Sequence, residues 1–222
     1  MSWLHLALLG GAIGVDSTAF PQIMVSRPLV AGALTGLLFG RPYEGLLLGA
    51  LLEVFHIATL PIGAARYPEA GTAAVSGTAA YMATTATLQV EVLFLAGVFA
   101  LAWERVAGAS VVAARRANEA LVVDPRAVLD PVRAITVRHV AALSLDFLRG
   151  ALVSLVGGLT GALVLRVLAP LWDWPDAIIR GAIAIAVATV LASALVVFGG
   201  WRERRLIFLF GILCGSLLSL FR

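Results

Sequence analysis

The last third of the chain divides into long apolar runs separated by short polar connections. Residues 150–165, 181–201 and 206–221 carry no charged side chain. A membrane-crossing helix needs about 20 mostly apolar residues, so each run predicts one crossing. The connection at 170–176 contains tryptophan and aspartate, whereas the connection at 199–205 contains three arginines. Because cytoplasmic loops are enriched in arginine, we expect the second connection in the cytoplasm and the first outside.

Apolar runs in the first hundred residues are shorter and more often interrupted. Residues 28–40, 45–52 and 54–65 are uncharged, but each run is too short to cross a bilayer at about 1.5 Å per residue. A longer run at 72–102 contains a polar cluster at 84–91. The N-terminal run is interrupted by Gly10, Gly11, Gly14, Asp16 and Pro21. Such segments are typical of discontinuous or re-entrant helices around a transporter site; the alternative is a set of ordinary tilted helices.

One long polar stretch, residues 103–139, separates these two parts. Apolar side chains recur every three or four residues from Trp103 to Leu121, which predicts an amphipathic helix on the membrane surface. The Asp-Pro pairs at 124–125 and 130–131 each resemble a helix N-cap followed by proline. Alternation of the later loops places the stretch in the cytoplasm. It is interpreted either as a solvated linker or as a surface that docks a partner.

Composition agrees with a membrane protein. Hydrophobic residues make up 61% of the 222 residues and charged residues 13%, whereas soluble domains average about 45–50% and 25%. We therefore expect an all-α integral membrane protein, a multi-helix transporter-like bundle with broken or re-entrant helices in its N-terminal half. Residues 1–222 would form a single membrane domain. Its parts would be a broken-helix substrate half at 1–102, a cytoplasmic amphipathic connection at 103–139 and three spanning helices at 140–222.

Charge and motifs exclude several classes of function. The net charge of +3 comes largely from the connecting segments, and no segment interleaves aromatic and basic residues as a nucleic-acid surface does. Cys214 is the single cysteine, and the three histidines are too far apart to form a local ligand pair. The sequence lacks the GxSxG, Walker, dinucleotide and HExxH motifs. We expect neither a catalytic residue nor a metal site.

Charged residues within the apolar N-terminal half are the candidate functional groups. A charge at the centre of a membrane helix costs about 2.5–3.5 kcal/mol on insertion scales, so it should face a partner or a wet cavity. Asp16 precedes Pro21 and could cap a half-helix that faces a polar ligand. Glu53, with His56 on the same helix face, could accept sugar hydroxyls. The alternative is a structural ion pair, most simply Arg27 with Glu53 or Asp16.

Glycines recur at nearly regular intervals between the candidate charges. They stand at Gly32, Gly36, Gly40, Gly45 and Gly49. This spacing places a glycine seam on one helix face, and small residues let helix backbones approach closely in lipid. Close helix packing is the leading interpretation, and a glycine-lined substrate path is the alternative.

The motifs of residues 10–75 resemble those of a known family. They are Asp16-x-Thr18-Ala19-x-x-Gln22-x-Met24-x-Ser26-Arg27-Pro28, Thr35-Gly36-x-x-x-Gly40, Gly45-x-x-x-Gly49-Ala50-x-Leu52-Glu53 and Leu60-Pro61-x-Gly63-Ala64-Ala65 with Pro68-Glu69. The chain resembles the IIC membrane component of mannose/sorbose-family sugar permeases of the phosphotransferase system. A weaker resemblance extends over most of the remaining chain.

The resemblance implies a transport subunit rather than an enzyme. It implies a hexose or related sugar as substrate, a second membrane subunit of the IID type, cytosolic IIA and IIB phosphoryl carriers, and no cofactor. It also implies a multi-pass protein of the bacterial cytoplasmic (inner) membrane, surrounded by lipid and assembled as an oligomer. The expected substrate-binding residues are Asp16, Gln22, Ser26, Arg27, Glu53, His56, Arg66 and Glu69. His56 and Arg66 differ from the expected family pattern, so the alternative is a regulatory or phosphotransferase-uncoupled sugar-binding protein of the same fold.

Overall fold

The computed structural model describes residues 3–57, 68–85, 87–122, 129–172 and 174–197, together with residues 124, 126, 205, 206, 209, 210 and 213. Within these residues all regular structure is helical, which confirms the all-α expectation. The elements are α1 (Trp3–Thr18), α2 (Pro28–Leu38), α3 (Pro42–Phe55), α4 (Ala70–Thr84), α5 (Val90–Glu119), α6 (Pro131–Leu168), the short 3₁₀ helix η2 (Ala169–Leu171) and α7 (Asp176–Val197).

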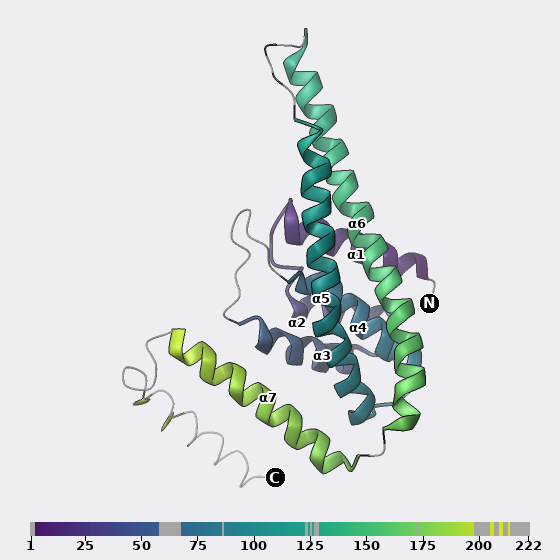
Figure 1. Ribbon diagram of the computed structural model, residues 1–222, viewed down its shortest axis with the longest axis vertical. Helices are drawn as coiled ribbons and strands as arrows, with labels where there is room; N and C mark the ends of the chain where they lie inside the picture. The colour runs from purple at the N-terminus through teal and green to yellow at the C-terminus, as the bar shows by residue number, and fades with distance from the viewer. Residues whose placement is uncertain are drawn as a thin grey trace.

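Two long helices form the central pair of the molecule. Helices α5 and α6 have 30 and 38 residues, and they lie side by side along the longest axis (Figure 1). The shorter helices α1 to α4 gather around the middle of this pair, while the linked ends of α5 and α6 project beyond them (Figure 1). In the described part of the chain, three helices are long and apolar enough to cross a membrane; they lie at Val90–Glu119, Pro131–Leu171 and Asp176–Val196.

The N-terminal half is built from short helices, as expected. Helices α1 to α4 have 16, 11, 14 and 15 residues. Pro28 begins α2 because its fixed φ suits the first helical position and its missing N–H costs no hydrogen bond there. The polar cluster at 84–91 separates α4 from α5, since α4 ends at Thr84 and α5 begins at Val90. These breaks confirm the sequence prediction.

The predicted interruption of the first helix at its glycines is wrong. Helix α1 continues through Gly10, Gly11 and Gly14 and ends only at Thr18. A Cβ added at Gly14 would lie 2.7 Å from the Cα of Gly150 in α6. The glycines therefore remove side chains where α1 meets α6, and the lost helix propensity is offset by close backbone packing.

The glycine seam belongs to two antiparallel helices rather than to one. Gly32 and Gly36 of α2 face Gly45 and Gly49 of α3, and a Cβ added at Gly45 would lie 2.6 Å from the Cα of Gly36. Gly40 lies in the turn between the helices with a φ of +71°, a conformation that glycine adopts readily. Close helix packing is thus the correct interpretation of the seam, and the glycines join α2 and α3 into one hairpin.

The stretch at 103–139 is not a separate surface helix. Helix α5 passes without a break from Val90 to Glu119, and α6 begins at Pro131. The reason is that Val111 and Ala114 are buried in the α5–α6 hairpin, so this half of α5 packs against a helix instead of a membrane surface. Asp130 caps α6 as expected, because its carboxylate accepts the N–H of Arg133 at 3.1 Å.

The predicted crossings after residue 140 have different bounds in the structure. The run at 150–165 is the second half of the much longer α6, and the run at 181–201 corresponds to α7, which begins at Asp176. Helix α6 ends at Leu168, η2 follows it to Leu171 and α7 begins at Asp176, so the two predicted crossings are separated near 170–176 as expected. Most of the run at 206–221 and of the arginine connection before it lies outside the described residues.

Candidate functional site

Arg27 and Glu53 form an ion pair at the open end of the α2–α3 hairpin. Arg27 is the N-cap residue of α2, and Glu53 lies in the last turn of α3. The Nε of Arg27 donates to Oε1 of Glu53 at 2.7 Å, and its Nη2 pairs with the same oxygen and donates to the carbonyl of His56 at 3.2 Å. Oε2 of Glu53 accepts the N–H of Leu29 at 3.2 Å. The ion-pair alternative for these two residues is therefore what the structure contains.

The ion pair of Arg27 and Glu53 is only partly buried in the protein. The side chains of Arg27 and Glu53 retain 26% and 23% of their exposure, whereas the other charged candidates that the structure describes are buried. A carboxylate has about four lone-pair sites and a guanidinium five donors, so such a pair has hydrogen-bonding capacity for a polar ligand beyond the ion pair itself. At this position two oppositely charged side chains of the α2–α3 hairpin remain partly exposed.

Asp16 holds the loop between α1 and α2. It lies in the last turn of α1, where its two oxygens accept the backbone N–H groups of Ile23 and Ser26, each at 2.8 Å. Asp16 therefore does not cap a half-helix, as was expected, because both oxygens are used by the loop that leads to Arg27. Gln22 in this loop is exposed, with a φ of 58°, and Ser26 is half-buried.

His56 turns away from Glu53. It is the C-cap residue of α3, so it lies beyond the last turn and does not share a helix face with Glu53. Its Nδ1 lies 2.9 Å from the carbonyl of Leu52, and its Nε2 lies 3.3 Å from Oε1 of Glu104 in α5. His56 and Glu104 are both buried, so this contact joins the end of α3 to the middle of α5 inside the protein.

Glu69 begins α4. Its carboxylate accepts the N–H of Thr72 at 3.2 Å and the Thr72 hydroxyl, which is the arrangement of an N-cap residue. Its own N–H donates to the carbonyl of Glu104 at 3.2 Å. Only 1% of Glu69 is exposed, so a sugar does not reach this carboxylate in the observed conformation.

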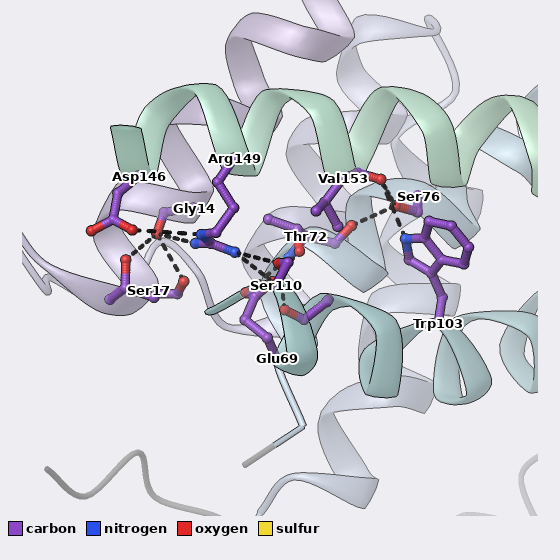
Figure 2. A network of polar contacts seen from close by, with 12 residues as sticks. Gly14, Ser17, Glu69, Thr72, Ser76, Trp103, Ser110, Asp146, Arg149 and Val153 are labelled. Atoms are coloured by element: carbon purple, nitrogen blue, oxygen red, sulfur yellow. Dashed lines mark hydrogen bonds and ion pairs between the residues drawn. The ribbon is translucent and has the colours of Figure 1, made fainter. Parts of the chain in front are cut away.

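A buried arginine of α6 connects these elements (Figure 2). Nη2 of Arg149 donates to the carbonyl of Gly14 near the end of α1 at 3.1 Å, and Nη1 donates to the hydroxyl of Ser110 in α5 at 3.3 Å. Nη1 also lies 4.0 Å from Oε2 of Glu69, and Nε lies 3.6 Å from Oδ1 of Asp146. One guanidinium thus contacts α1, α5 and α6 and the residue that begins α4.

Sequence reasoning missed Glu104, Asp146 and Arg149. The signal for the last two was an acidic and a basic residue three positions apart, immediately before the uncharged run at 150–165. No role was predicted for them, because the charges that they meet are far away in sequence. Glu104 likewise lies next to Trp103 in the stretch at 103–139, which was interpreted as a solvated linker or as a surface that docks a partner.

The described candidates form two adjoining groups. Arg27 and Glu53 lie with the Asp16 loop, and Glu69 lies with Arg149. Glu104 joins the two groups, since its side chain meets His56 and its carbonyl accepts the N–H of Glu69. Arg66 and the Pro61–Arg66 connection lie outside the described residues. Among the residues that the structure describes, no three His, Cys, Asp or Glu side chains could together hold a metal ion.

Comparisons with solved structures support the fold. A structure described as "Structure of membrane protein" superposes with a TM-score of 0.73 at 18% identity, over 100% of this chain and 96% of that chain. A second structure contains the mannose transporter ManYZ with microcin E492; its TM-score is 0.48 at 19% identity, over 100% of this chain and 95% of that one. The first likeness shows the fold alone, and the second is too distant to support an argument.

Comparisons with sequences identify the family. The sorbose-specific EIIC component of the phosphotransferase system from Lacticaseibacillus casei is 33% identical over 66 residues, which are 30% of this chain and 24% of that protein. The alignment therefore spans about a quarter of the relative's length. The family described as the sorbose-specific IIC component of the phosphotransferase system matches residues 1–162, well over half of the chain. The chain belongs to this family of phosphotransferase-system membrane components.

Proposed function

We propose that this chain is the sugar-translocating IIC subunit of a mannose/sorbose-type permease. It binds a hexose or related sugar and moves it inward for phosphorylation by cytosolic IIA and IIB subunits. The observation that carries the proposal is the family match over residues 1–162, which include helices α2 and α3 and the ion pair of Arg27 and Glu53. The proposal places the chain in a bacterial cytoplasmic membrane, in an oligomer that includes a IID-type subunit.

Exposure divides the candidate residues into two roles. In this proposal Arg27 and Glu53 contact the sugar, because both are polar, charged and about a quarter exposed. Gln22 and Ser26 join them from the loop before α2, since Gln22 is exposed and Ser26 only half-buried. A sugar hydroxyl both donates and accepts, so an adjacent guanidinium and carboxylate can satisfy both functions of one hydroxyl.

The buried candidates support the site in this proposal rather than contact the sugar. Asp16 holds the loop through two backbone N–H groups, and Glu69 holds the start of α4. His56 joins α3 to α5 through Glu104. Arg66 remains a predicted sugar contact because the family resemblance places the connection that contains it, residues 63–69, at the sugar site. In this proposal the phosphoryl-carrying residues belong to the cytosolic subunits, so the subunit contributes binding and movement rather than chemistry.

Uptake of labelled hexoses tests the proposal. Vesicles would contain the chain and its IID-type partner, and uptake would be measured with and without phosphoenolpyruvate and the soluble phosphoryl carriers. We expect sugar phosphate to accumulate only when the carriers are present. Equilibration of sugar that ignores the carriers would instead support the uncoupled alternative. Failure of every hexose to bind or enter, with the two membrane subunits assembled, would contradict the proposal.

A further inference from the structure

Arg149 occupies the point where the end of α1, the start of α4 and the middle of α5 meet the long helix α6. Figure 2 shows its guanidinium directed at Gly14, Ser110, Glu69 and Asp146. Gly14 lies in the last turns of α1, and Glu69 is the N-cap residue of α4. The end of one short helix and the start of another are therefore fixed by the same side chain.

The charges around this guanidinium make it difficult to replace. Glu69 and Asp146 are both buried carboxylates beside it, and Arg149 is the cation that the structure places between them. At the Gly14 carbonyl it also supplies a positive charge to the C-terminal end of α1, where a helix favours cations. A planar guanidinium presents donors in several directions at once, and an ammonium group cannot reproduce that fork.

The segments that Arg149 fixes are those that flank the loop at 19–27. Two residues after Gly14, Asp16 accepts the loop N–H groups of Ile23 and Ser26. On the other side, a Cβ added at Gly71, two residues after Glu69, would lie 2.7 Å from the carbonyl oxygen of Ser26. The loop therefore lies between the two segments, and it ends at Arg27.

We propose that Arg149 is a positioning residue that sets the end of α1 and the start of α4 against α6, and so places the loop that presents Arg27 to the sugar. Its action on sugar binding rests on the proposed function, whereas its action on the loop does not. Arg149 does not touch the sugar in this arrangement; it acts through Gly14 and Glu69.

Transport kinetics test the effect on binding. Arg149→Lys keeps the positive charge but loses the several donors of the planar guanidinium. We therefore expect the KM for sugar uptake to rise about tenfold, while the maximal rate per assembled transporter is retained. Arg166→Lys is the matched control, because Arg166 of the same helix is exposed and donates to a single carbonyl, that of Ala83, at 3.0 Å. A merely structural role would lower the amount of active protein and leave KM unchanged, and that result would overturn the proposal.

A distance measurement tests the effect on the loop without any sugar. Spin labels would be attached to cysteines at Ile23 and Leu152, which are 66% and 60% exposed, in the assembled complex with Cys214 replaced by serine. We expect Arg149→Lys to broaden the distance distribution about twofold, since the loop loses a fixed anchor, and Arg166→Lys to leave it unchanged. A distance distribution of unchanged width in Arg149→Lys would overturn the proposal for Arg149. This holds even if the uptake experiment supports the proposed transport function.

Two milder variants keep the test decisive if Arg149→Lys does not assemble. Ser110→Ala removes one partner of Nη1, and Asp146→Asn removes the charge beside Nε. We expect each to raise KM about threefold and to broaden the label distribution in the same direction. Wild-type KM and width in both variants would overturn the proposal.

Discussion

The guanidinium of Arg27 and the carboxylate of Glu53 form an ion pair at the end of the α2–α3 hairpin that lies opposite its turn. Arg27 directly precedes α2, Glu53 lies in the last turn of α3, and Nε lies 2.7 Å from Oε1. The glycine contacts hold the rest of the hairpin together, so the ion pair lies at a fixed end rather than on two independent helices. Because both side chains remain partly exposed, this end can exchange a protein contact for a ligand contact.

Replacing Glu53 by glutamine tests this end of the hairpin. Glu53→Gln removes a charge that faces Arg27, so we expect sugar affinity to fall about tenfold while the protein still inserts and assembles. Equilibrium binding or uptake would measure it. Glu44→Gln is the matched control, since Glu44 pairs with Arg41 at 3.0 Å near the opposite end of the same hairpin. Equal effects of the two variants on binding would contradict a sugar role for Glu53.

The glycine contact between α2 and α3 gives a prediction for stability. A Cβ at Gly45 would lie 2.6 Å from the Cα of Gly36, so Gly45→Ala must push two backbones apart. We expect a loss of about 1–3 kcal/mol, the usual cost of overpacking, seen as a lower thermal midpoint in detergent. Gly181→Ala in α7 is the control, because its Cβ would meet nothing within 4 Å. An unchanged thermal midpoint in Gly45→Ala would contradict this prediction, because it would show that α2 and α3 can move apart without loss of stability.

Asp16 gives a prediction about the loop that it holds. Asp16→Asn leaves one carbonyl oxygen and places an amide group against a backbone N–H, so Ile23 or Ser26 loses its acceptor. We expect amide exchange in residues 19–27 to quicken about tenfold, measured by hydrogen exchange on the intact protein. Asp176→Asn, at an exposed pair with Arg180, should leave this peptide unchanged. Unaltered exchange in Asp16→Asn would mean that other contacts hold the loop.

The contact with Arg149 distinguishes Glu69 from an ordinary N-cap residue. Asp130→Ala removes an exposed cap of α6 and should cost about 1 kcal/mol. Glu69→Ala removes the cap of α4 and also the carboxylate beside Arg149, so we expect a loss of about 2–4 kcal/mol. Thermal or denaturant unfolding in detergent would compare the two variants. Equal losses would show that the Glu69–Arg149 contact adds nothing to stability.

Local chemistry made the helix ends predictable from the sequence. Pro28 and the Asp130-Pro131 pair begin helices because proline and capping residues act on their own neighbours. The glycines of α1 were misinterpreted, since the same residue type weakens an isolated helix and permits a close approach to a partner helix. Only the position of Gly150, more than a hundred residues away, distinguishes the two effects.

One pairing of the candidate residues was predictable from the sequence, and the other pairings were not. The Arg27–Glu53 pair was one of the alternatives, whereas the contacts of His56 with Glu104 and of Glu69 with Arg149 were not foreseen. Those contacts depend on how α5 and α6 lie against the short helices. Periodicity and caps describe one segment at a time, so they carry no information about which distant charges share a buried space.

The backbone contact between α2 and α3 also restricts the genetics of this hairpin. Four glycines face the backbone of the other half of the hairpin so closely that an added Cβ would lie 2.5 to 2.7 Å from the nearest backbone atom. They are Gly32, Gly36, Gly45 and Gly49. Glycine is the one encoded residue without a Cβ, so every missense mutation at these four codons introduces an atom into that contact. We therefore expect neutral substitutions in the hairpin to fall mainly at its other positions, so that the glycine spacing is kept while the surrounding sequence changes.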